Sequence, residues 1–309
     1  MINATAKNTK SRITKNTNLC KLCFVSFVVL FFVSFVVLFF VPFVVAFSQT
    51  QPRRIVSLVP NVTEILFAIG AGPQVVAVST YDVEPPEVRS LPTVGALVDP
   101  DTERIIALRP DLVITYGSQT DLQSQLKATN IPFFDYRHGG LEHIFVTMRA
   151  LGALTGHVEE ADAAARTLRS RIDAVKARVA GKPRPKTLLV FGREPGSLRN
   201  IYASGGRGFL HDMLVAAGGE DVLNDIDKES AQVSTETILA RSPEVIIELN
   251  AANRLNDADL KKVVDPWMTL SSVPAVKNKR VIVLMGPGLT VPGPRVAAGI
   301  EQMARVLHP

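Results

Sequence analysis

Four tyrosines and one tryptophan are the aromatic residues best suited to contact a small molecule. Tyr81, Tyr116, Tyr136 and Tyr202 each lie at or after the end of a short apolar run that is typical of a strand, and Trp267 lies in a loop-rich segment. Ligands of open parallel sheets bind beyond the carboxyl ends of the strands. Aromatic rings offer a large contact area at little entropic cost. We therefore predict a ligand cleft lined by these rings, although a tyrosine at a strand end also serves simply to bring its hydroxyl to water.

Polar side chains in the same loops supply further candidate contacts. The segment SGGRG at 204–208 opens a predicted helix, whose backbone amides can hold an anion. It lacks the lysine and serine of a phosphate-binding loop, so a simple glycine turn is the preferred interpretation. The predicted ligand contacts are Pro60, Tyr81, Tyr116, Arg193, Tyr202, Arg207 and Trp267.

The residue types required for catalysis or metal binding are not arranged in any known pattern. Both cysteines, Cys20 and Cys23, lie near the N-terminus, and no serine lies in a G-x-S-x-G motif. His138 and His143 are the closest pair of histidines, and a spacing of five is poor for one helical face. We expect no catalytic residue, no metal site and no resident cofactor.

Residues 1–48 have the character of an export signal. A basic segment without acidic residues precedes the apolar run 24–47, which repeats one eight-residue unit three times, and Ala46-Phe47-Ser48 suits a cleavage site. Signal cores are about 7–15 residues long and membrane spans about 20, so this leader is a signal peptide or an uncleaved anchor. Either alternative places the remainder of the chain in the periplasm or another extracytoplasmic compartment.

The net charge belongs to this leader. Five of the 34 lysines and arginines lie in it, which leaves 29 to balance the 29 acidic residues. A balanced domain gives no reason to expect a nucleic-acid partner, and we expect a monomer.

An internal repeat predicts two similar lobes. TERIIALRPDLVI at 102–114 aligns without a gap to TETILARSPEVII at 235–247, and ILFAIGAG at 65–72 resembles MLVAAGGE at 213–220. Each longer segment predicts a short helix, a proline that ends it, and a buried strand. A repeat at this separation is typical of two copies of one lobe.

Short apolar strands alternate with helices on both sides of a long helical segment. Alternation of this kind predicts an α/β fold with parallel sheets covered on both faces. Ala, Leu, Arg and Glu dominate the middle segment until Gly181 and Pro183, which predicts one stiff connecting helix over 158–180. The predicted domains are an N-terminal lobe at 53–157, the connecting helix at 158–182 and a C-terminal lobe at 186–309. Predicted strands lie near 54–59, 75–79, 111–115, 132–135, 187–191, 244–249 and 280–284, and predicted helices near 62–70, 102–108, 119–128, 141–155, 208–217, 235–241 and 295–307.

Several segments together resemble a known family. RRIVSLVPNVTEILFAIGAG, VVAVSTYDVEPP, AGGEDVL and the two repeat segments are similar, in the same order, to the cobalamin- and iron-chelate-binding periplasmic proteins of ABC importers. The resemblance covers about residues 53–308. It implies two Rossmann-like lobes joined by one long backbone helix, the fold class called a helical-backbone periplasmic binding protein. It also implies the capture of a small chelate, not catalysis.

The resemblance favours the cobalamin-binding branch, with two alternatives left open. STYDVEPP resembles the segment of that branch that carries a corrinoid-contacting tyrosine, which here is Tyr81. The stretch VGALVDPDTE departs from the pattern, because Ala96 and Leu97 stand near the place where a cobalamin-binding relative has tryptophan and haem-binding relatives have tyrosine. The ligand is thus a corrinoid, a ferric siderophore or haem.

The repeat also predicts a docking surface. Glu103 and Glu236 occupy equivalent positions, each in the first turn of its helix. The family resemblance implies that they pair with arginines of a two-subunit permease, which connects this chain to the importer's ATPase. The simpler interpretation is that an acid near a helix N-terminus stabilises the helix, with Asp101 and Ser234 as caps. A different class of function, a membrane-anchored α/β sensor or enzyme, remains as the alternative.

Overall fold

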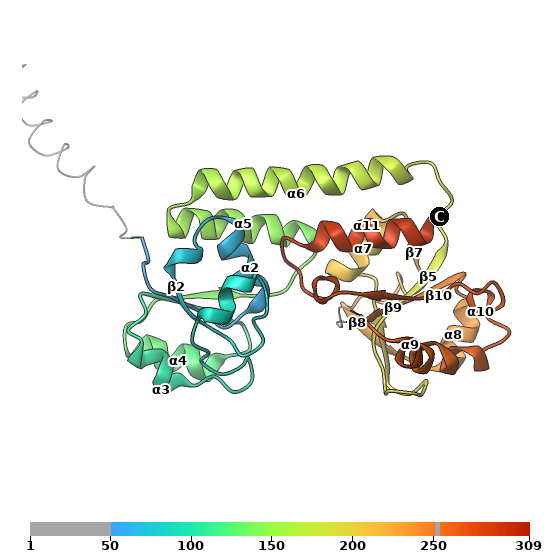
Figure 1. Cartoon of the computed structure of the whole chain (residues 1–309), viewed down its shortest axis with the longest axis horizontal. Helices are drawn as coiled ribbons and strands as arrows, with labels where there is room; N and C mark the ends of the chain where they lie inside the picture. Colours follow the sequence, from blue (N-terminus) through green and yellow to red (C-terminus); the bar gives the residue numbers. More distant parts are fainter. Residues whose placement is uncertain (1–50, 251–253) are drawn as a thin grey trace, which may run out of the picture. The chain divides into compact units, whose positions relative to one another are not determined.

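The computed structural model describes residues 51–250 and 254–309. They form two α/β lobes, each built on its own sheet (Figure 1). The predicted leader and its cleavage site lie outside the described residues. Within the described ranges, no helix combines the length and the apolar character needed to cross a bilayer.

The sheet of the first lobe is parallel throughout. Its strands have the order β2-β1-β3-β4, so that the strand order reverses direction between β1 and β3. In open α/β sheets this switch point is where ligands bind, beyond the carboxyl ends of the strands. The four strands, all of them predicted, are β1 (Ile55–Ser57), β2 (Val75–Val78), β3 (Leu112–Tyr116) and β4 (Phe133–Tyr136).

Three helices connect these strands, and a fourth follows the last strand. The first begins at Pro60, whose fixed φ suits the first helical turn. The last ends at Gly156, which has a φ of 82° in the left-handed region that favours glycine. The helices are α2 (Pro60–Ala68), α3 (Thr102–Ala107), α4 (Thr120–Ala128) and α5 (Leu141–Thr155), with short 3₁₀ helices at Gly72–Gln74 and Pro86–Ser90.

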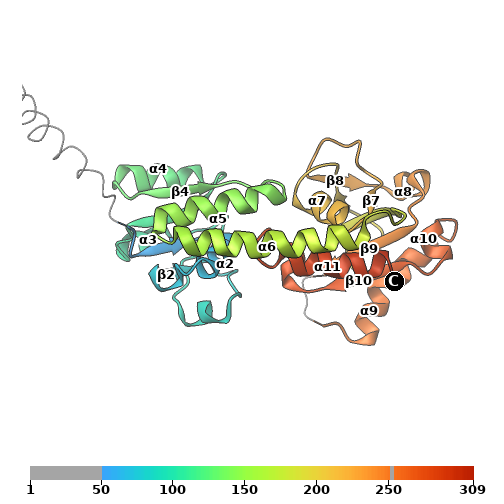
Figure 2. The same cartoon turned by 90° about the horizontal axis from the view of Figure 1, so that it is seen from above.

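One long helix, α6 (Val158–Val179), passes from the first lobe to the second (Figure 2). Acidic residues occupy its first turn and basic residues its last, which suits the helix dipole. Its apolar seam packs against α5 of the first lobe and α11 (Val296–Leu307) of the second. The predicted connecting helix is therefore confirmed. The seam consists of Ala161, Ala165, Leu168, Ile172, Val175 and Val179.

The sheet of the second lobe is mixed, which corrects the prediction of a parallel sheet. Its order is β10-β9-β5-β6-β8, with β7 paired to β5, and β6 runs antiparallel to both of its neighbours. Buried and exposed residues alternate in β8, and an exposed tyrosine interrupts the buried residues of β6, so neither strand has the continuous apolar run that is typical of a parallel strand. The strands are β5 (Lys186–Gly192), β6 (Ile201–Ser204), β7 (Glu220–Asp221), β8 (Ser230–Val233), β9 (Val245–Asn250) and β10 (Val281–Met285).

The helices of the second lobe include every one that was predicted, and α9 and α10 in addition. Ser234 caps α8 by accepting from the backbone N–H of Thr237, as Asp101 caps α3 by accepting from that of Arg104. The two repeat segments thus form the same helix–strand unit, α3–β3 and α8–β9. The helices are α7 (Phe209–Ala216), α8 (Thr235–Arg241), α9 (Asp257–Val264), α10 (Pro274–Lys277) and α11, with 3₁₀ helices at Asp265–Thr269 and Pro287–Leu289.

An ion pair joins the two lobes beside a shared apolar core. Arg295, which precedes α11, donates to both carboxylate oxygens of Glu64 in α2, at 2.6 and 2.8 Å. Asn61, also in α2, donates to the carbonyl oxygen of Pro292 at 3.2 Å. These contacts fix the start of α2 against the segment that leads into α11.

A helix cap from the other lobe makes a second junction. The N-cap residue of α5 is Gly140, which has no side chain to satisfy the free N–H groups of the first turn. Asp212 of α7 accepts instead from the backbone N–H of Leu141 at 2.8 Å. The first turn of α5 is therefore completed by the second lobe.

Candidate ligand-binding site

A cluster of rings occupies the carboxyl ends of β3 and β4. The parallel register places Tyr116 opposite Tyr136, and their ring centroids are 6.2 Å apart. His138, two residues beyond β4, stands with its ring centroid 5.0 Å from that of Tyr116 and 5.6 Å from that of Tyr136. The strand register alone explains why residues twenty positions apart form one aromatic surface.

The cluster is uncharged at neutral pH. Burial raises the pKa of Tyr136 to about 12, although a hydrogen bond from Asn61 opposes the shift. Burial also raises the pKa of Tyr116, and the carboxylate of Glu229 raises it further. His138 keeps an exposed surface, but partial desolvation of its ring lowers its pKa below the usual 6.5. The phenol of Tyr116 and the neutral imidazole of His138 thus form the wall of the first lobe, with the buried phenol of Tyr136 behind them.

Glu229 is the second lobe's contribution to this environment. It lies in the turn before β8, yet its charge acts on Tyr116, Tyr136 and His138 of the first lobe. Glu229 also lines a cavity of 190 Å³ next to Phe191 and Phe209. The site therefore faces both lobes. Sequence reasoning did not single out these three residues, although Phe191 near the end of β5 satisfies the same strand-end criterion as Tyr116.

Tyr81 and Pro60 lie at the ends of the two neighbouring strands. Pro60 opens α2 directly after β1. Tyr81 is 69% exposed in the turn after β2. Asp82 holds that turn by accepting from the N–H and hydroxyl of Ser79, at 2.9 and 2.6 Å, and burial raises the pKa of this aspartate. Both predicted contacts therefore lie at the carboxyl edge of the first sheet.

Tyr202 and Arg207 come from the second lobe. Tyr202 lies within β6 and not in a loop as predicted, and it is 42% exposed with its ring centroid 6.5 Å from that of Phe191. Arg207 is exposed and pairs with Asp227 at 3.5 Å. Tyr202 is thus joined to the site through Phe191, whereas Arg207 is directed to a carboxylate on the surface.

Trp267 and Arg193 do not have the predicted accessibility. Trp267 is 0% exposed, and its indole N–H donates to Glu248 at 2.8 Å. The Arg193 side chain is 3% exposed and pairs with the same carboxylate at 3.1 Å. The expectation that Trp267 lines the cleft is therefore wrong in this structure, because a buried glutamate in the central strand β9 requires both residues as partners.

The two glutamates of the repeat are exposed on equivalent helices. Glu103 lies in the first turn of α3 and Glu236 in that of α8. Figure 1 shows both helices on the side of the molecule away from α6. Hydrogen bonds from Ser234 and the local backbone lower the pKa of Glu236. Both side chains are available to a partner.

Metal ligands are not grouped in the described part of the chain. Among residues 51–250 and 254–309, no set of three histidine, cysteine or acidic side chains is close enough to hold an ion.

Two lobes, a single long helix between them and an aromatic surface at the strand ends define a solute receptor of the two-lobed type. The sequence pattern of the periplasmic binding protein family matches residues 55–286. The chain therefore belongs to this family.

Individual relatives bind different tetrapyrroles. The chain is 32% identical over 256 residues to a vitamin B12-binding protein of Salmonella typhimurium strain LT2. The aligned region covers 82% of this chain and 90% of that relative. It also resembles two crystal structures at 25% identity. One is the periplasmic vitamin B12 binding protein of Vibrio cholerae, with a TM-score of 0.70 over 83% of this chain and 97% of that protein. The other is a periplasmic heme-binding protein of Roseiflexus sp. RS-1, with a TM-score of 0.69 over 83% of this chain and 98% of that protein.

Proposed function

We propose that this chain is the substrate-binding component of an ABC importer and that it captures a corrinoid, cobalamin, between its lobes. The observation that carries the proposal is the aromatic surface of Tyr116 and His138, backed by the buried ring of Tyr136, which suits a large planar ligand. The likeness to a vitamin B12-binding protein along 90% of that relative's length supports the same ligand.

The charges near the site favour a neutral ligand over an anionic one. Of the arginines in the loops at the strand ends, three pair with a carboxylate, Arg137 with Asp135, Arg193 with Glu248 and Arg207 with Asp227, whereas the exposed Arg199 has no carboxylate partner among the described residues. Glu229 adds a negative charge beside the rings. Haem and many ferric siderophores carry acidic groups, which would require free cations. The likeness to a heme-binding structure keeps haem as the second candidate, and a ferric siderophore as the third.

A competitive titration tests the ligand. Calorimetry of the purified chain with cyanocobalamin, haemin and a ferric hydroxamate should give the highest affinity for cyanocobalamin. Stronger binding of haemin or of the hydroxamate would contradict the corrinoid assignment while leaving the receptor function intact. Binding of none of the three, by a folded protein, would instead favour the sensor or enzyme alternative.

The receptor function implies partners and a location. We infer that Glu103 and Glu236 dock onto arginines of the permease, one from each lobe, and that the ATPase acts through the permease. Their exposure on equivalent helices supports this role. Export by the N-terminal signal would place the domain outside the cytoplasm, where a monomer without a resident cofactor delivers its cargo.

A further inference from the structure

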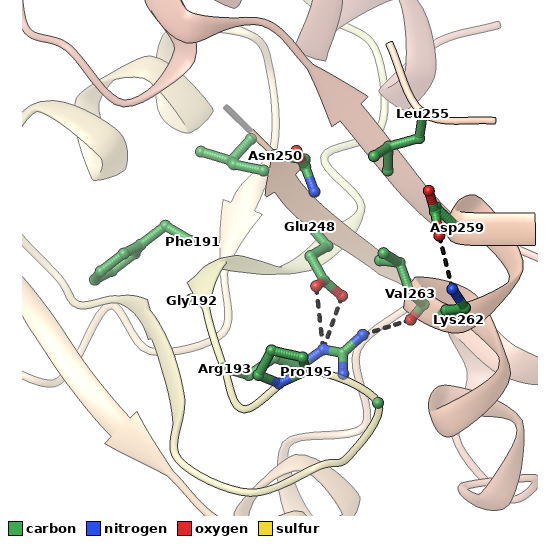
Figure 3. Close-up of a pocket in the computed structure, with 12 residues that line it drawn as sticks. Phe191, Gly192, Arg193, Pro195, Glu248, Asn250, Leu255, Asp259, Lys262 and Val263 are labelled. Atoms are coloured by element: carbon green, nitrogen blue, oxygen red, sulfur yellow. Dashed lines mark hydrogen bonds and ion pairs between the residues drawn. The ribbon is translucent and has the colours of Figure 1, made fainter. Parts of the chain in front are cut away.

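A cavity of 540 Å³ lies within the second lobe, apart from the predicted aromatic contacts (Figure 3). Its walls come from the carboxyl ends of β5 and β9 and from α9. It shares Phe191 with the 190 Å³ cavity beside Glu229, so the two cavities meet at one side chain. Its volume falls in the range of small-molecule pockets, about 300–1,000 Å³.

The charged groups of this cavity neutralise one another. Each nitrogen of the Arg193 guanidinium has a partner: Nε donates to Glu248, Nη1 to the carbonyl of Ser197, and Nη2 to the carbonyl of Val263. Asp259 and Lys262 of α9 form a second pair at 2.8 Å (Figure 3). Three of the five guanidinium N–H groups are therefore engaged, Glu248 compensates the positive charge, and the walls carry no net charge.

Apart from Asn250, the rest of the lining is apolar, and it leaves open space next to the backbone of β5. Phe191, Leu249, Leu255 and Val263 supply the apolar surface. At Gly192, an added Cβ atom would meet no atom within 4 Å, so the cavity reaches the main chain of β5. The backbone there is not in the left-handed region, and a larger side chain would fit without strain.

We propose that this second-lobe cavity is a binding site for a neutral group that carries an aromatic ring or a carboxamide, and that it receives such a substituent of the transported ligand. The latter part rests on the function proposed above. An anionic group would lose its hydration without gaining a free cation, whereas a neutral group would exchange water for apolar walls. The cavity thereby selects among chelates by their side groups, while the aromatic surface binds the planar ring.

The chain contains one tryptophan, and it reports on this cavity. Trp267 is hydrogen-bonded to Glu248 and lies 5.6 Å from the Arg193 guanidinium, and both of these residues line the cavity. The probes are benzamide and benzoate, which match in size and differ in charge. Benzamide should change the Trp267 fluorescence saturably, with the weak affinity of a small fragment. Benzoate should bind about 10-fold more weakly or not at all, because a buried charge without a partner is costly.

Two substitutions at Gly192 locate the binding. Gly192→Leu should fill the cavity and abolish the benzamide response, and Gly192→Ala should weaken it less. Ala240→Leu, which places the same leucine side chain at an exposed position of α8, is the control and should bind benzamide like the wild type. Three outcomes would each refute the proposed binding site. They are a benzamide response that does not saturate, benzoate binding as strong as that of benzamide, and an unchanged benzamide response in a folded Gly192→Leu variant.

A titration with cyanocobalamin relates the site to transport. If the cavity holds a neutral substituent of the corrinoid, Gly192→Leu should weaken cyanocobalamin binding about 10-fold or more, as expected when an anchor group loses its pocket. Unchanged affinity would show that the ligand does not use the cavity. A wild type that binds benzamide and no corrinoid would refute the function proposed above and retain the site.

Discussion

The two lobes share a repeated helix–strand unit but present different chemistry at their strand ends. In the first lobe, Tyr116 and His138 keep accessible ring surface beyond β3 and β4. In the second lobe, the largest aromatic residue, Trp267, is buried and serves as a hydrogen-bond donor to Glu248. A repeat in the sequence therefore fixes the framework, whereas the residues that follow each strand decide whether an aromatic ring faces a ligand or a buried charge.

The position of the polar residue in the sheet explains this difference. Glu248 lies in β9 opposite Val190 of β5, with β10 on its other side. A carboxylate in the middle of a sheet must be paired and hydrogen-bonded, and Arg193 and Trp267 satisfy it. The corresponding strand of the first lobe, β3, places only Thr115 and Tyr116 at its end, and neither requires a counter-charge.

The largest effect, on transport, should come from the glutamates that the two lobes share, Glu103 and Glu236. The double substitution Glu103→Ala and Glu236→Ala should abolish uptake of labelled ligand into cells while leaving the affinity of the purified protein unchanged. Single substitutions should show whether the lobes contribute equally. Normal transport by a double variant that folds and binds ligand would mean that both glutamates serve only the helix ends.

Breaking the buried pair of the second lobe should have the next largest effect. Arg193→Ala leaves Glu248 buried without its cation, and the free energy of unfolding should fall by about 3–5 kcal/mol. Arg137→Ala is the matched change in the first lobe, where the pair with Asp135 is exposed, and it should cost less than about 1 kcal/mol. Denaturant unfolding measures the stability loss of both variants. Equal losses would mean that the buried pair of the second lobe matters no more to folding than the exposed pair of the first.

The aromatic surface of the first lobe should matter to binding more than to folding. Tyr116→Ala should weaken ligand binding by about 2 kcal/mol, or roughly 30-fold, because a central aromatic contact is lost. Trp267→Phe, which removes the indole donor in the second lobe, should instead lower stability and change the affinity little. Calorimetry combined with thermal unfolding distinguishes the two outcomes, and the reverse pattern would contradict the site described here.

The smallest effect concerns the imidazole beside the rings. The pKa of His138 is lowered from 6.5 mainly by desolvation, so the folded protein binds this proton less readily than the unfolded chain does. Stability should therefore decline as the pH falls below about 6.5, and His138→Gln should remove that part of the decline. Glu229 favours the protonated ring across the lobes, so Glu229→Gln should lower the pKa of His138 further, as NMR titration would detect.

Regular apolar patterns made most of the framework predictable. The predicted helices agree with the structure to within two residues at their ends, because each has an apolar stripe and a recognisable proline, glycine or cap. The strands β6 and β8 were missed because Tyr202 and Gln232 interrupt their apolar residues. Short alternating strands of this kind depend on their neighbours for recognition.

The site was only partly predictable, for reasons of tertiary contact. Tyr116 could be found because it ends a strand. The burial of Trp267 could not, because it depends on a glutamate nineteen positions away that the fold brings to its indole nitrogen. Glu229 belongs to a polar turn with no distinguishing motif, and only the arrangement of the lobes places it near the rings.

The cap that Asp212 provides for α5 has a consequence for the order in which the chain matures. The two residues that meet are 71 positions apart, and the chain is made from its N-terminus. While the first lobe is newly synthesised, the N–H of Leu141 at the start of α5 lacks the acceptor that Asp212 later supplies, since Gly140 has no side chain to replace it. The N-terminal cap of α5 is therefore completed only after α7 has been made. A nascent chain arrested before Asp212 should therefore expose the start of α5 to proteases, and extension past α7 should protect it.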